Sequence, residues 1–151
     1  MKRSGIWAIG IATFVSAGSL AVEQAYSSDQ GGPTSCSNAT LKGIYMFANS
    51  GFQSVSPSLV PLGVTGKDVF YGNGKFDSLA TLSIGGTIVP NVAAPGTYTV
   101  NSDCTGTAII HMTAAPDVRL DLFVAPDGDQ IFEIETDPGT VLSRPSPRVA
   151  R

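Results

Sequence analysis

The residues that most constrain the fold are 117–137, DVRLDLFVAPDGDQIFEIETD, because they contain every element of a β-hairpin. Apolar and polar side chains alternate on both sides of a Pro-Asp-Gly-Asp turn, and a period of two is typical of half-buried strands. In the first arm, one face carries Val118, Leu120, Leu122 and Val124. The other face carries Arg119, Asp121 and Phe123. The second arm places Phe132 and Ile134 opposite Ile131, Glu133 and Glu135.

Similar turn signals recur along the chain at intervals of roughly ten residues, as in small all-β domains. Gly-Asn-Gly at 72–74 separates two apolar runs, and Asn-Ser-Asp-Cys-Thr-Gly at 101–106 separates two more. The proline-containing segments 54–66 and 87–95 are expected to be loops, and a short edge strand within 87–95 is the alternative. The sequence therefore predicts an all-β antiparallel meander of about eight strands, closed into a small barrel, with a β-sandwich as the alternative.

The N-terminal residues have the pattern of a secretory signal peptide. Basic residues in MKRSG precede an uncharged apolar run, 6–22, and small residues follow it. We expect residues 1–27 to be a signal helix that is cleaved on export, and an uncleaved anchor is the alternative. The predicted organisation is then a flexible leader at 28–35, the barrel domain at 36–143 and a flexible tail at 144–151. The protein is expected in the periplasm or outside the cell, with no membrane contact after cleavage.

The composition limits the partners that the protein can have. Charged residues make up only 14% of the chain and the formal net charge is −3, so no basic surface for nucleic acid is expected. Hydrophobic residues make up 42%, which is too many for a disordered chain.

The chain contains two cysteines, Cys36 and Cys104. An even count in an exported protein favours pairing, so we predict a disulfide that joins the start of the domain to a hairpin turn. The alternatives are two free thiols, or a catalytic thiolate with His111 as its base. No CxxC pair or zinc-like cluster is present, so no metal site and no cofactor are predicted.

Three segments resemble a group of small exported bacterial proteins of uncharacterised function. They are CSNATLKGIYMF at 36–47, YTVNSDCTGT at 98–107 and ETDPGTVLS at 135–143. The layout of that group is similar to the calycin-type barrels, which include lipocalins and allene-oxide-cyclase-like proteins. The resemblance implies a barrel fold and does not by itself fix a function. The shared residues are cysteine, turn and strand-start residues, which indicates a structural role for them.

The candidate catalytic residues are Glu133, Glu135 and His111. A histidine in an apolar strand is usually a packed core residue, and a base is the alternative. Together with Arg119 and Asp121, the two glutamates are expected on one face of the last hairpin. That face is either a solvated ladder of ion pairs or an interior site for acid–base chemistry.

The candidate ligand-binding residues are aromatic. Tyr45, Phe47, Tyr98 and Phe123 are expected either to line a pocket or to form the core. The function that the sequence favours is non-catalytic binding of a small apolar ligand in the barrel. The alternatives are an isomerase or cyclase of the allene-oxide-cyclase-like type, and a structural or surface-interaction protein with a filled barrel. The oligomeric state is not predicted.

Overall fold

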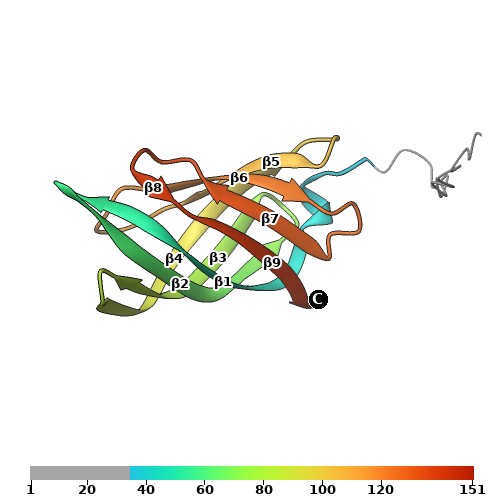
Figure 1. Ribbon diagram of the computed structural model, residues 1–151. Helices are drawn as coiled ribbons and strands as arrows, with labels where there is room; N and C mark the ends of the chain where they lie inside the picture. The colour runs from blue at the N-terminus through green and yellow to red at the C-terminus, as the bar shows by residue number, and fades with distance from the viewer. Residues whose placement is uncertain (1–34) are drawn as a thin grey trace, which may run out of the picture. The chain divides into compact units, whose positions relative to one another are not determined.

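The chain closes into an eight-stranded antiparallel β-barrel with one additional short strand (Figure 1). The computed structural model describes residues 35–151, which contain no α-helix. The elements are a 3₁₀ turn, η1 (Asn38–Thr40), and the strands β1 (Lys42–Val55), β2 (Ser58–Tyr71), β3 (Lys75–Ile84), β4 (Thr87–Val100), β5 (Thr105–Ile110), β6 (Val118–Val124), β7 (Gln130–Glu135), β8 (Thr140–Val141) and β9 (Ser143–Ala150). The predicted all-β barrel is confirmed, and the sandwich alternative is wrong.

Closure of the barrel depends on the last strand. Strands β1 to β7 pair in sequence order, and β9 then lies between β7 and β1. The short β8 pairs only with the far end of β1, at Phe52 and Gln53. Because β1 also pairs with β2, every barrel strand has two neighbours. The barrel is therefore closed, without an open sheet edge between β1 and β2.

The two proline-containing segments that we expected to be loops are strands. Residues 54–66 contain the end of β1, the turn and the first part of β2. Residues 87–95 belong to β4 and pair with β3 alone, as the edge-strand alternative predicts. In β4 the ladder with β3 shifts register between Ala80 and Leu82, opposite Pro90 and Asn91. A bulge accommodates a proline that cannot donate to the ladder, which explains why the sequence signal for a loop was misleading.

The prediction that residues 144–151 form a flexible tail is wrong. Strand β9 covers Ser143–Ala150, so the barrel extends beyond residue 143. Its prolines, Pro145 and Pro147, are exposed, whereas Arg144 and Ser146 are buried. The predicted signal peptide at 1–27 and almost all of the leader at 28–35 lie outside the described residues.

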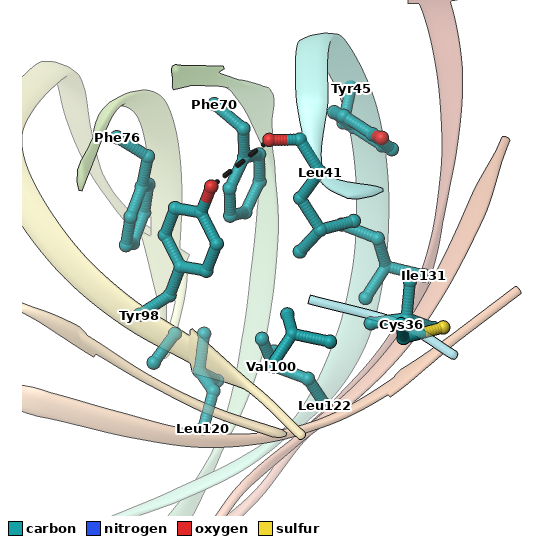
Figure 2. Packing of buried hydrophobic residues seen from close by; sticks show 12 residues of the cluster. Cys36, Leu41, Tyr45, Phe70, Phe76, Tyr98, Val100, Leu120, Leu122 and Ile131 are labelled. Atoms are coloured by element: carbon teal, nitrogen blue, oxygen red, sulfur yellow. Dashed lines mark hydrogen bonds between the residues drawn. The ribbon is translucent and has the colours of Figure 1, made fainter. Parts of the chain in front are cut away.

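One half of the barrel interior is filled by four aromatic rings together with aliphatic side chains such as Leu41, Leu122 and Ile131 (Figure 2). Phe70 and Phe76 stack with their ring centroids 4.8 Å apart, and Tyr45 and Tyr98 meet Phe70 edge to face. The Tyr98 hydroxyl donates to the carbonyl of Leu41 at 3.0 Å, so it stays hydrogen-bonded although it is buried. The aromatic rings close this half of the barrel, and the buried hydroxyl groups of Tyr45 and Tyr98 each donate a hydrogen bond to a backbone carbonyl.

A disulfide joins Cys36 to Cys104, as predicted, with their Cα atoms 5.0 Å apart. Cys104 lies in the β4–β5 turn, and the bond holds the segment with η1 against that turn. The β6–β7 turn covers the same segment. Gly128 has a φ of +70°, and a Cβ there would meet the Thr40 carbonyl oxygen at 2.2 Å. Two predicted turns therefore close the aromatic end of the barrel.

No helix in residues 35–151 combines the length and the hydropathy needed to cross a membrane.

Candidate functional site

The half of the barrel away from η1 is hollow. A cavity of about 580 Å³ is lined by residues from β1 to β9, and its walls are mainly aliphatic. The aliphatic lining includes Leu62, Val64, Ala80, Leu82, Ala94, Ile110, Leu120 and Leu142. The volume falls within the range of roughly 300–1,000 Å³ that is usual for small-molecule sites.

The cavity follows from side-chain size along each inward face. On β3, Phe76 fills the closed half, whereas Ala80 two alternations further along leaves space. On β4, Tyr98 fills the closed half and Ala94 borders the cavity. Since successive inward positions are two residues apart, the change from aromatic to small residues sets where the packed interior ends.

A buried ion-pair cluster lies at the inner end of the cavity. Arg144 on β9 donates to Asp68 on β2 at 2.7 Å, and its Nε donates to Glu133 Oε2 on β7 at 2.7 Å. The guanidinium carbon also lies 3.7 Å from the centre of the Phe47 ring. All three charged residues are almost fully buried, and Arg144 and Glu133 line the cavity.

The cluster contains two carboxylates and one cation, so it has an uncompensated negative charge when all three groups are ionised. Burial, and after it the charge of Glu133, raise the pKa of Asp68 to about 6 against the opposing attraction of Arg144. The native state therefore binds the Asp68 proton more tightly than the unfolded chain does. Its stabilising contribution is complete below about pH 4 and is lost as the pH rises through about 6.

Three further carboxylates border the cavity, nearer the strand ends. Asp117 lies in the β5–β6 connection, Glu135 ends β7, and Asp137 lies just beyond it. Burial raises the pKa of Glu135, and the nearby charge of Asp137 also raises it. Asp137 pairs with Arg119 at 3.0 Å. Arg144 is the only Lys or Arg among the described residues that line the cavity.

The structure divides the predicted ligand-binding residues among three places. Phe47 lines the cavity, as expected. Tyr45 and Tyr98 belong to the packed aromatic core and do not border the cavity. The expectation for Phe123 is wrong, because its side chain is on the outer surface and 56% exposed, across from Phe132.

The expectation that four charged residues share one face of the last hairpin is also wrong. Glu133 and Glu135 point inward, because they lie opposite the inward-facing Leu122 and Leu120. Arg119 and Asp121 are exposed on the outside. Residues directly opposite each other share a face, so the strand register, set by the turn at 125–129, separates the two pairs.

His111 is not part of the cavity lining. Its Nδ1 is 3.1 Å from Asp117 Oδ2, and its Nε2 is 3.1 Å from Thr97 Oγ1. The hydrogen bond with His111 lowers the pKa of Asp117. The order hydroxyl, imidazole, carboxylate resembles a nucleophilic triad, but Thr97 lies on the outer face of β4. The arrangement holds the β5–β6 connection against β4.

Several polar residues of the site are missing from the predicted set, among them Asn49, Asp68, Ser78, Asp117, Asp137 and Arg144. Arg144 was assigned to the tail, although the alternation in Arg-Pro-Ser-Pro-Arg already had the period of a strand. Within residues 35–151, no three His, Cys, Asp or Glu side chains are grouped so that they could hold a metal ion.

The fold and the site define a small antiparallel barrel with one filled half and one hollow half. No family model, no curated protein and no solved structure matches the chain. The resemblance to small exported bacterial proteins and to calycin barrels therefore stays a prediction.

Proposed function

We propose that this protein binds a small apolar ligand, without catalysis, in the hollow half of its barrel. The observation that carries the proposal is the cavity of about 580 Å³ with mainly aliphatic walls. Burying apolar ligand surface against such walls contributes roughly 25 cal/mol per Å². A cavity built into rigid strands also needs little reordering when it takes up a ligand.

The proposed setting is outside the cytoplasm. The Cys36–Cys104 disulfide is compatible with an oxidising compartment, and the pattern of residues 1–27 predicts export. A soluble barrel in that setting would carry or sequester an apolar compound that is poorly soluble in water.

The two rival functions have less support. An isomerase or cyclase would need an acid–base pair at the ligand, yet His111 is outside the cavity and Glu133 Oε2 is bound to Arg144. A purely structural barrel would be filled along its whole length, as the aromatic half is. Binding is the function that uses the hollow half.

A matched pair of tryptophan substitutions tests the proposal. Ala94 borders the cavity, whereas its neighbour Ala93 is exposed on the outer face of the same strand. We expect the neutral probe N-phenyl-1-naphthylamine to bind the wild-type protein with increased fluorescence. Ala94→Trp should weaken this binding at least about tenfold by filling the cavity, and Ala93→Trp should leave it unchanged. Ala80→Trp, at another lining position, repeats the test if Ala94→Trp does not fold.

The proposal would be abandoned if the wild-type protein did not bind the probe. It would also fail if both tryptophan variants weakened binding equally, because the probe would then be on the outer surface.

A further inference from the structure

The inner end of the cavity carries hydrogen-bond acceptors that have no donor. Glu133 Oε1 is buried and unpartnered, although Oε2 of the same carboxylate accepts from Arg144. Asn49 Oδ1 is also buried without a partner, and both residues line the cavity. A buried acceptor without a donor has lost its hydrogen bonds to water without replacing them, and this cost is larger when the acceptor is charged. A ligand that brings a donor to this point would recover that cost.

The positive charge of Arg144, at the inner end of the cavity, is already compensated by Glu133 and Asp68. Arg144 uses Nε and Nη2 on Glu133 and Asp68, and its flat face covers Phe47. The Nε–Nη2 edge of the guanidinium, which could otherwise bind a ligand carboxylate in a bidentate manner, is therefore occupied. A carboxylate ligand would add a third negative charge to a buried cluster that has two such charges and only one positive charge.

Further carboxylates border the cavity nearer the strand ends, where Asp137 pairs with Arg119 and Asp117 is hydrogen-bonded to His111. Asp117, Glu135 and Asp137 border the cavity, and Arg144 is the only Lys or Arg that does so among the described residues. The site thus combines aliphatic walls with buried acceptors and an excess negative charge at its inner end, where Asp68 and Glu133 share one cation. Electrostatic complementarity favours a ligand with the opposite sign at its inner end.

Building on the proposed function, we infer that the cavity selects an elongated apolar molecule with an amine at one end. The ammonium group donates to Glu133 Oε1 and neutralises the excess charge of the Asp68–Arg144–Glu133 cluster. The hydrocarbon part lies along the aliphatic walls. A hydroxyl end group satisfies the acceptor without neutralising the charge, so an alcohol of equal length should bind more weakly than the amine.

Competition among three ligands of equal chain length tests this inference. Decylamine, decanol and decanoate would each displace N-phenyl-1-naphthylamine from the wild-type protein at pH 7, below their aggregation concentrations. We expect the amine to compete best, the alcohol next and the carboxylate least. Amine and carboxylate should differ by at least about tenfold, because a hydrogen bond to a charged group contributes about 1.5–3 kcal/mol.

The variant Glu133→Gln assigns the selectivity to one residue. The glutamine amide can still accept from Arg144 but offers an N–H toward the cavity, so the preference of decylamine over decanol should fall by about tenfold. Asp121→Asn is the matched control, because it removes one negative charge from the outer face of β6 and should change no ranking.

Each outcome separates this inference from the proposed function. If the probe binds but decanoate competes as well as decylamine, binding stands and the amine preference is wrong. If the amine is preferred but Glu133→Gln keeps the full preference, the role of Glu133 is wrong. If neither the probe nor any of the three ligands binds, the proposed function fails and this inference fails with it. The wild-type ranking decides the amine preference even if Glu133→Gln does not fold.

Discussion

Arg144→Met should destabilise the protein by about 3–5 kcal/mol at pH 8, the usual cost of removing one partner from a buried ion pair. The substitution keeps most of the side-chain volume but leaves Asp68 and Glu133 as two buried carboxylates without a cation. The contact between the guanidinium and the Phe47 ring is also lost. Urea unfolding at pH 8 and pH 5 measures the effect, which should be smaller at pH 5 because a protonated carboxyl group needs no cation.

The control for this prediction is Asp68→Asn, which changes the same cluster but keeps the Arg144–Glu133 pair. Burial raises the pKa of Asp68 to about 6, so the ionised form is the costly one, and removing its charge should cost little or nothing at pH 8. The variant should also lose the decrease in stability that Asp68 contributes between about pH 4 and pH 6. Equal stability of Arg144→Met and Asp68→Asn at pH 8 would show that Arg144 does not stabilise the two buried carboxylates.

Removing the disulfide should have the second large effect. We expect the double variant Cys36→Ala/Cys104→Ala to lose about 2–5 kcal/mol, because the bond joins residues 68 positions apart and restricts the unfolded chain. The same bond holds the η1 segment, whose Asn38 side chain accepts from the Val100 N–H at 2.8 Å. The double variant should therefore also loosen the aromatic end of the barrel.

Urea unfolding with and without a reducing agent provides the comparison. Reduced wild-type protein should unfold at the same urea concentration as the double variant, and oxidised wild-type protein at a clearly higher one. A single midpoint for all three samples would mean that the bond adds nothing to stability.

The sequence predicted the strand content and most of the turns because those depend on local signals. Gly-Asn-Gly at 72–74, the turn around Cys104 and the Pro-Asp-Gly-Asp turn all connect neighbouring strands in the structure. The disulfide was predictable because the chain has only two cysteines. Proline-based rules failed at Pro90 and in β9, where a bulge and outward-facing positions accommodate residues that normally indicate loops.

The candidate site was less predictable because it depends on contacts between distant segments. Arg144 and Asp68 are 76 positions apart, and nothing near either residue indicates the other. Tyr45 and Phe47 share the inward face of β1, yet only Phe47 reaches the cavity. The boundary between the filled and hollow halves depends on side-chain volumes from all the barrel strands together, and a single strand pattern does not contain that information.

Ligand binding requires the hollow half to be open in the folded protein, and a crystal of the oxidised protein under xenon pressure tests this most directly. Xenon enters empty apolar cavities. We expect xenon density among Leu82, Ile110 and Leu120, and none among Phe70, Phe76 and Tyr98 in the closed half. A crystal structure without xenon, in which side chains fill the space beside Ala80 and Ala94, would contradict the account.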